Sequence, residues 1–177
     1  TLISFPTPTG QFQDFLIEEV STFHPDLAAR FPMIQAYKGR SIEQPATTIR
    51  FSVSPQQLSG MIHLGNGLPV FIDKRKNTAD QLYEVYYKKH KEREPFACEV
   101  HEIVNKTISN TNARYQGADC QLRTFRLALA CTGEYAQYHG GNTEDVLAAM
   151  NATLTIINGI FERDLAIHLE LIPETTS

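Results

Sequence analysis

The sequence predicts an α+β protein in which a β-rich N-terminal part is followed by a β-α-β unit. Short segments of residues 1–90 alternate apolar and polar side chains and are separated by Pro, Gly and Asn, as strands joined by turns are. Residues 122–171 then show a strand pattern, an amphipathic helix pattern and a second strand pattern. This order is typical of a right-handed crossover between two parallel strands.

The first elements are separated by proline and glycine. The segment Phe5–Gly10 has turn chemistry, and residues 11–20 alternate in the manner of an edge strand. A helix of one or two turns is expected between Pro25 and Pro32, because proline suits the first helical turn and stops a helix later on. Residues 47–54 (TTIRFSVS) show the period of two that marks a further strand.

A hairpin is predicted around Gly65-Asn66-Gly67. Asn-Gly supplies the positive φ angles of a tight reversal, so residues 61–64 and 68–73 are expected to pair. Residues 81–90 fit a strand or a short helix equally well. Residues 107–119 are polar and rich in Ser, Thr, Asn and Gly, which predicts a linker between a domain of residues 1–106 and a second part of residues 120–177.

The second part begins with a strand over Leu122–Thr132, whose apolar side chains fall on both faces near its end. This pattern predicts a central strand covered on both sides. A helix is expected from Thr143, as its cap, to Asn158-Gly159, where it would terminate. Residues 165–171 then alternate as a strand with one buried face. The apolar stripe of the helix consists of Val146, Leu147, Met150, Leu154 and Ile157.

Composition and charge exclude two classes of partner. The 177 residues carry 16 basic and 20 acidic side chains, a net charge of −4, and the one basic cluster, Lys88–Arg93, is interrupted by an acid. We therefore expect no nucleic acid partner. No apolar run approaches the roughly 18 residues that a membrane helix requires, so no membrane partner is expected either.

The closest approach to a metal motif is His101-Glu102-Ile103-Val104-Asn105. A zinc helix needs HExxH, because histidines four residues apart project from one helix face toward the same ion, and Asn105 replaces the second histidine. The other histidines have no companion at ligand spacing and are interpreted as surface or packing residues. No catalytic or metal-binding residue is predicted within this chain.

Charged residues near the last strand predict structural ion pairs. Glu162, Arg163 and Asp164 stand just ahead of that strand and are able to form a network. Arg123 and Arg126 point to opposite faces of their strand, and at least one of them needs an acidic partner if it is buried. Pairing of Arg163 or Arg126 with Glu134 or Glu162 is the arrangement we expect.

The three cysteines leave alternatives open. Cys120 and Cys131 bracket the predicted strand and would lie about 36 Å apart at ~3.3 Å per residue, too far for a disulfide. A Cys98–Cys120 disulfide is sterically open and would imply an oxidising compartment. The alternative is that all three thiols are free, with Cys131 buried.

Two long segments, LRTFRLALACTGEYAQYHGG (122–141) and VLAAMNATLTIINGIFERDLAIHLELI (146–172), resemble the start of the catalytic domain of metzincin zinc peptidases. The resemblance is to the bacterial reprolysin-like (adamalysin-type) group, which includes secreted multidomain proteins. Residues 1–100, through FHPDLAARFPMIQAYKGRS and TTIRFSVSP, resemble the propeptide that precedes that domain. The fold then implied is a β-rich propeptide-like domain followed by the β-α-β opening of a metzincin catalytic domain.

This resemblance implies a secreted zymogen whose propeptide shields the catalytic cleft and whose residues 107–119 suit an activation cleavage. The family's zinc ligands and catalytic glutamate lie in HExxHxxGxxH, which this sequence lacks, so no catalytic residue is carried over. Zinc is expected in the remainder of the catalytic domain, and the chain alone is expected to be inactive. Cys98 is then a candidate "cysteine switch", a thiolate that occupies the open zinc position, beside its alternatives as disulfide partner or inert thiol.

The partner implied by the resemblance is the remainder of the catalytic domain, in the same precursor or in a second chain. The parent enzyme would act on protein or peptide substrates. The absence of an initiator Met and the end shortly after a strand favour a fragment of a longer protein. Two alternatives remain: a non-catalytic binding or adhesion module on the same β-α-β scaffold, and an unrelated α+β enzyme.

Overall fold

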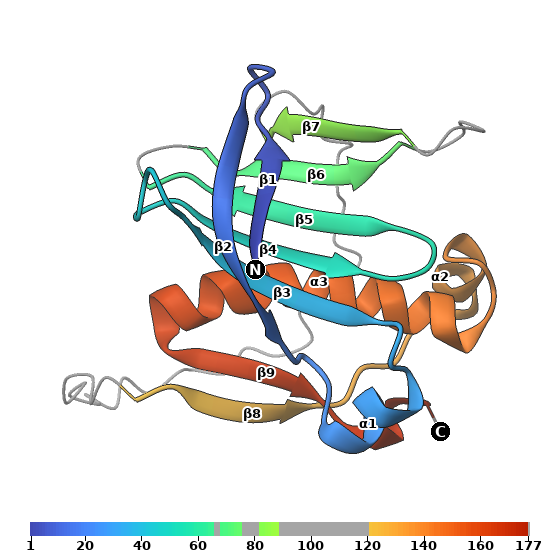
Figure 1. Ribbon diagram of the computed structural model, residues 1–177. Helices are drawn as coiled ribbons and strands as arrows, with labels where there is room; N and C mark the ends of the chain where they lie inside the picture. The colour runs from blue at the N-terminus through green and yellow to red at the C-terminus, as the bar shows by residue number, and fades with distance from the viewer. Residues whose placement is uncertain (66–67, 76–81, 89–120, 177) are drawn as a thin grey trace, which may run out of the picture.

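A computed structural model of the protein describes residues 1–65, 68–75, 82–88 and 121–176. Its N-terminal part is an antiparallel sheet in which each strand pairs with the next along the chain (Figure 1). The short helix α1 (Pro25–Arg30) interrupts this meander. The seven strands, in chain and sheet order, are β1 (Leu2–Pro6), β2 (Phe12–Val20), β3 (Gln35–Ser41), β4 (Thr48–Val53), β5 (Leu58–His63), β6 (Val70–Lys74) and β7 (Tyr83–Tyr87).

The sheet curls around a core of its own. Side chains alternate across each strand, so every second residue turns to the concave side. There the ring of Phe5 on β1 lies 5.0 Å from the ring of Phe51 on β4, although two strands separate β1 from β4 in the sheet. This core consists of Phe5, Phe15, Ile17, Ile49, Phe51, Ile62, Val70 and Ile72.

The C-terminal part is a β-α-β unit with an additional short helix. Its elements are β8 (Arg123–Leu127), α2 (Gly133–Tyr138), α3 (Thr143–Leu165) and β9 (Ile167–Leu171), followed by a 3-10 turn at Pro173–Thr176. Strands β8 and β9 pair in parallel, with Phe125 opposite Leu169. The predicted parallel crossover is confirmed.

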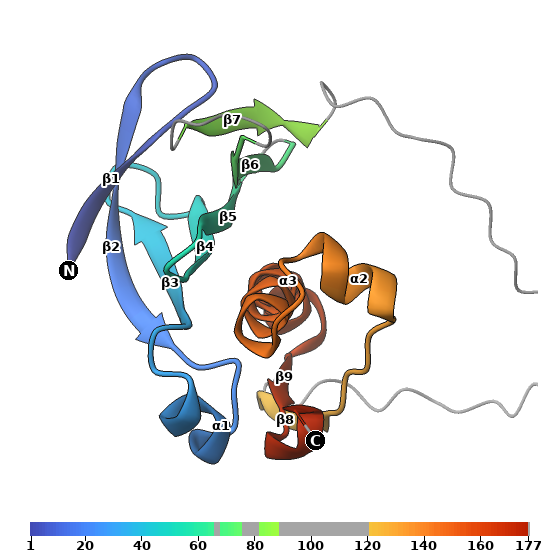
Figure 2. The same cartoon turned by 90° about the vertical axis from the view of Figure 1, so that its right-hand side faces the viewer.

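Helix α3 lies between the two sheets (Figure 2). One side of the helix contacts β3, β4 and β5, and another side contacts β9. A second core joins the two parts of the chain, because Phe23, Leu27 and Ile34 from the region around α1 pack with residues of α3 and with Leu171 of β9. The α3 residues in this core are Val146, Leu147, Ala148, Met150 and Leu154.

Most N-terminal predictions agree with these elements. The strand at 11–20, the helix after His24, the strand at 47–54 and the hairpin between β5 and β6 are confirmed. The ambiguous segment at 81–90 contains the strand β7. The edge position expected for β2 is wrong, because β1 and β3 flank it on both sides. The strands β1 and β3 and the helix α2 were not anticipated.

The boundaries predicted for α3 are wrong at both ends. Asn142, and not Thr143, caps the helix, and its side-chain oxygen accepts a hydrogen bond of 2.8 Å from the backbone N–H of Asp145. The helix then continues through Asn158-Gly159 to Leu165. Asn158 does not stop it, because its side-chain amide donates to the carbonyl of Leu169 and accepts from the N–H of that residue, both at 2.8 Å. These tertiary contacts outweigh a local stop signal.

The prediction for the first C-terminal strand is also corrected. It ends at Leu127 rather than at Thr132, whose side chain caps α2. Its residues 123–126 are exposed, so it is not a central strand covered on both sides. Among the described residues β8 pairs with β9 alone, and α3 covers one face of this pair. Cys131 is a free and exposed thiol and is not buried as the sequence had indicated.

Candidate functional site

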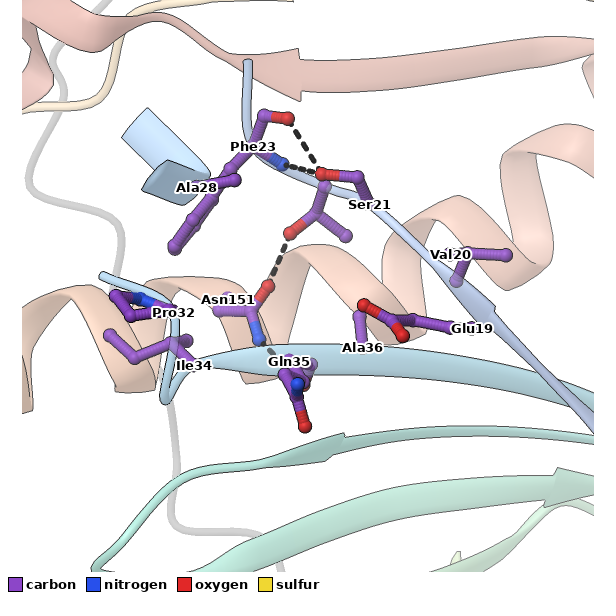
Figure 3. Close-up of a pocket in the computed structure, with 11 residues that line it drawn as sticks. Glu19, Val20, Ser21, Phe23, Ala28, Pro32, Ile34, Gln35, Ala36 and Asn151 are labelled. Carbon is purple, nitrogen blue, oxygen red and sulfur yellow. Dashed lines mark hydrogen bonds between the residues drawn. The ribbon is translucent and has the colours of Figure 1, made fainter. Parts of the chain in front are cut away.

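The surface of α3 that faces the large sheet is polar at its centre. Asn151, which is 1% exposed, projects from α3 toward Gln35 of β3 (Figure 3). Its amide donates to the hydroxyl of Ser52 at 2.8 Å and to the carbonyl of Gln35 at 3.2 Å, and its carbonyl oxygen accepts from the hydroxyl of Thr22. One side chain therefore bridges β3, β4 and the segment before α1.

A cavity of ≈ 240 Å³ lies beside Asn151 (Figure 3). Within the cavity wall, the hydroxyl of Ser21 bonds to the backbone carbonyl and N–H of Phe23. The hydroxyls of Ser21 and Thr22 and the side-chain amide of Asn151 thus each have a protein partner. The wall consists of Glu19, Val20, Ser21, Thr22, Phe23, Ala28, Pro32, Ile34, Gln35, Ala36 and Asn151.

A cluster of charged side chains also lies between α3 and the large sheet, near the C-terminal end of α3. Glu162 lies between Arg50 of β4 and His168 of β9, and the three side chains are 18%, 13% and 15% exposed. One carboxylate oxygen of Glu162 accepts from the Arg50 guanidinium, and the other lies 2.7 Å from Nδ1 of His168. The second ring nitrogen, Nε2, lies 3.1 Å from the carbonyl oxygen of Ser21. We name these three side chains the clasp.

Burial of Glu162 acts to raise the pKa of its carboxyl group, but the hydrogen bond from His168 and the charge of Arg50 outweigh it, so the pKa lies below the ordinary 4.5. A carboxyl group whose pKa is lower in the folded than in the unfolded state stabilises the fold above its unfolded-state pKa. That stability is lost as the pH falls through the lowered value. The clasp is therefore expected to weaken in strong acid.

The ion pairs predicted from the sequence are partly wrong. Glu162 pairs with Arg50 and His168 and with neither Arg163 nor Arg126. Arg163 pairs with its neighbour Asp164 at 2.6 Å. Arg126 is exposed on β8, so it needs no buried partner. Sequence reasoning overlooked Arg50 because strand β4 and helix α3 are 112 residues apart at this contact.

An apolar groove of ≈ 400 Å³ follows the side of α3 next to β8. Its lining includes Leu127 and Leu129, Met150 and Leu154 of α3, and the exposed Cys131. The remaining lining residues are Ala130, Thr132, Tyr135, Thr153, Ile157 and Leu169. Part of this lining also belongs to the core around α3, which contains Met150 and Leu154.

Among the described strands, β8 has a partner on one edge only. The N–H of Arg123 and the carbonyl of Leu127 bond to backbone groups at the two ends of β9, so the odd-numbered residues of β8 face β9. The backbone groups of Thr124 and Arg126 therefore face away from it, because they alternate along a strand. In the part of the chain that the structure describes, no strand pairs with this side of β8.

The cysteine, metal-motif and linker candidates that remain from the sequence are not among the residues that the structure describes. Cys98, Cys120, the segment His101–Asn105 and the linker at 107–119 lie outside the described residues. Within the described ranges, no three His, Cys, Asp or Glu side chains gather in a way that could hold a metal ion. The same ranges contain no helix that is long and apolar enough to span a membrane.

Three residues of the α3 contact went unrecognised in the sequence. Asn151 stands next to Met150 of the apolar stripe, but polar residues flank the stripe of any amphipathic helix, so its position alone did not indicate burial. From the sequence His168 was interpreted as an ordinary surface or packing histidine, and no role was predicted for Arg50. No periodic pattern identifies either of them. Arg50 lies 112 residues from Glu162, and the six-residue step from Glu162 to His168 crosses from the end of α3 into β9.

Comparison with known proteins supplies one match. Residues 121–177 match the model of a metallopeptidase family described as family M12B, reprolysin-like. No curated protein and no solved structure matches the chain. The matched residues begin two positions before β8 and contain the whole β8–α3–β9 unit. The C-terminal part of this chain is therefore similar to the reprolysin-like metallopeptidases.

Proposed function

We propose that the chain is the N-terminal part of a secreted, bacterial zinc-dependent metalloendopeptidase zymogen. In this proposal residues 1–106 act as the propeptide, residues 107–119 contain the activation cleavage site, and residues 120–177 open the catalytic domain. The observation that carries the proposal is the family match, whose range coincides with the β8–α3–β9 unit. The N-terminal sheet packs directly on that unit through α3, and this contact supports a shielding role for the sheet.

The open side of the β8–α3–β9 unit supports the proposal that this unit is only one part of a catalytic domain. Parallel sheets are found buried on both faces, and unpaired strand edges are normally covered. Here the β8 edge has no partner among the described strands, and an apolar groove of ≈ 400 Å³ lies beside it. We propose that the remainder of the catalytic domain, in the same precursor or in a second chain, covers both.

Zinc is proposed to bind in that remainder. The described residues of this chain do not fit a zinc site, since they bring no three suitable ligands together. We therefore assign no step of peptide hydrolysis to them. Their part in the proposed enzyme is to form the first layer of the catalytic domain and to hold the propeptide against it.

A direct test uses the parent protein, extended past residue 177. We expect an HExxH motif within about 100 further residues, the remaining size of a typical domain. The activated protein should contain one zinc ion per molecule by atomic absorption and should hydrolyse an unfolded protein substrate such as casein. A chelator should abolish this hydrolysis, and added zinc should restore it. The matched control replaces the glutamate of that motif by glutamine, which should retain zinc and lose hydrolysis.

Absence of the motif, or hydrolysis that is unaffected by the chelator, would contradict the peptidase proposal. A parent protein that lacks the motif and is inactive but still folds would instead support a binding or adhesion module.

A second test concerns the open edge of β8. We expect the 177-residue chain alone to self-associate, because exposed edges and apolar grooves promote pairing between chains. Thr124→Pro removes an N–H that faces away from β9, so it should reduce association without breaking the β8–β9 pair. Light scattering and sedimentation velocity measure the outcome. Thr124→Ser keeps the N–H and is the matched control. A wild-type chain that stays monomeric at high concentration would argue against an uncovered edge.

A further inference from the structure

The face of the large sheet opposite its own core is only partly covered by α3. Side chains alternate along a strand, so the even-numbered residues of β1, β2, β3 and β4 share this face. Helix α3 covers the part that contains Arg50 and Ser52, through Glu162 and Asn151. It contacts β3, β4 and β5, and among the described elements none covers the part of this face on β1 and β2 (Figure 2).

Large apolar side chains gather on the uncovered part. Leu2 of β1 lies opposite Leu16 of β2, and Phe12 lies farther along β2 on the same face. Ile42 follows β3, and its N–H donates to the carbonyl of Asp14 at 3.1 Å, which continues the ladder and makes Leu16 and Phe12 its diagonal neighbours. Each of the four apolar side chains is more than half exposed. Grouped exposed apolar residues of this kind mark an interaction surface.

A groove of ≈ 1040 Å³ connects this patch with the end of α3. Its lining includes Leu16 of the patch, Lys38 and Arg40 of β3, Arg50 of β4 and Arg163 of α3. Pockets for small molecules measure roughly 300–1,000 Å³. This groove is at least as large and continues onto the exposed patch, so its size suits a segment of polypeptide.

The groove carries more positive than negative charge. Four basic and two acidic side chains line it, and both acids are already engaged, Glu162 with Arg50 and Glu18 with Lys38 at 3.0 Å. Arg40 is exposed, and among the described residues no acidic side chain pairs with it. Its guanidinium is therefore available to a carboxylate from outside the chain. The exposed Glu18–Lys38 pair contributes little by itself, so Lys38 is able to exchange its partner as well.

We propose that this face binds an acidic peptide segment in which apolar side chains stand next to carboxylates. The apolar side chains of the peptide cover Leu2 and Leu16, and a carboxylate is bound bidentately by the guanidinium of Arg40, which lies opposite Leu16 across the β2–β3 pair. Leu2, Leu16 and Arg40 stand on three adjacent strands, so ~10 Å separates the first from the last at ~4.8 Å per strand. About three extended residues span that distance.

The charges on this face favour a peptide over a uniformly anionic partner. Glu18 lies on the same face as Arg40, and a nucleic acid or an anionic membrane surface would bring further negative charge against it. A peptide places its carboxylates only where the guanidinium is. This binding site goes beyond the peptidase function proposed above and does not depend on it.

The test measures binding of a short fluorescein-labelled peptide, two leucines followed by a run of glutamates, to the full 177-residue chain by fluorescence anisotropy. The chain is used at concentrations at which sedimentation velocity shows monomers. Arg40→Gln should weaken binding about tenfold, as for the loss of a charge-assisted hydrogen bond. Leu16→Thr should weaken it about fivefold, because less apolar surface is buried. Both positions are exposed, so both variants should fold, which circular dichroism checks.

Matched controls make the result specific. Arg126→Gln replaces an exposed arginine on β8, and Leu122→Thr replaces a leucine before β8 that is also more than half exposed. Both should leave binding unchanged. A second peptide, with glutamines in place of the glutamates, should bind the wild type about tenfold more weakly and should not respond to Arg40→Gln.

Absence of binding, or binding that neither Arg40→Gln nor Leu16→Thr weakens, would overturn the proposal. Equal binding of the glutamine peptide would do the same. If Leu16→Thr abolishes self-association of the chain and Thr124→Pro does not, a second copy is the occupant and the proposal is wrong. Binding to anionic lipid vesicles in place of the peptide also contradicts it. None of these measurements involves peptidase activity, so a failure here leaves the peptidase proposal untouched.

Discussion

Replacing Leu171 by alanine is expected to lower the free energy of unfolding by about 2–5 kcal/mol, the range for a leucine removed from a closed core. Leu171 is 0% exposed and lies in the core that joins α3 to the region around α1. Its backbone also connects the two parts of the chain, since its N–H donates to the carbonyl of Thr22 and its carbonyl accepts from the N–H of His24, both at 2.8 Å.

Urea unfolding followed by circular dichroism measures this loss. Leu165→Ala is the matched control, because Leu165 belongs to the same connection between α3 and β9 but is 57% exposed. It should change the free energy of unfolding by no more than about 0.5 kcal/mol. A small effect of Leu171→Ala would mean that the N-terminal sheet and the β8–α3–β9 unit do not share a core in solution.

Replacing Asn151 by leucine is expected to lower the free energy of unfolding by about 2–4 kcal/mol in the same measurement, because more than one buried polar group loses its partner. The substitution leaves the hydroxyls of Thr22 and Ser52 and the carbonyl of Gln35 without the partner that they have now. A buried polar group that loses its partner costs about 1–3 kcal/mol. The loss falls in the contact between α3 and the large sheet, so amide exchange should rise in β3 and β4.

A rescue variant separates this effect from simple crowding. Removing the hydroxyls together with the amide, in Asn151→Leu combined with Thr22→Val and Ser52→Ala, leaves fewer unpaired groups in the buried contact. This triple variant should regain a substantial part of the stability lost by Asn151→Leu. If it is less stable still, the cost arises from the size of leucine and not from unpaired polar groups.

Hydrogen bonds and charges supply much of the contact between the large sheet and α3. Asn151 and the clasp of Arg50, Glu162 and His168 lie along one side of the helix, whereas the apolar core lies toward α1. Contacts between domains of one chain are commonly polar in this way, and they separate more readily than a single core does. Such a contact suits a propeptide that has to be released, which is the function proposed for the N-terminal sheet.

Local patterns were sufficient for the order and type of the main elements. Period-two alternation predicted β2 and β4, the Gly-Asn-Gly turn predicted the β5–β6 hairpin, and the strand-helix-strand order at 122–171 predicted the parallel β8–β9 pair. These succeed because the side-chain period and turn chemistry are properties of adjacent residues. The similarity of residues 121–177 to reprolysin-like metallopeptidases was likewise evident from the sequence and agrees with the family match.

Only the tertiary structure decided where these elements end and what holds them together. From the sequence alone, Asn158 predicts the end of a helix, but in the structure its side-chain amide bonds to the backbone of Leu169 in β9 and the helix continues. Residues 128–132 were likewise predicted as strand, although β8 ends at Leu127. The clasp joins side chains from β4, α3 and β9, which no spacing in the sequence brings together. Interactions between distant segments depend on the packing of the whole chain, and a single sequence carries no local signal for them.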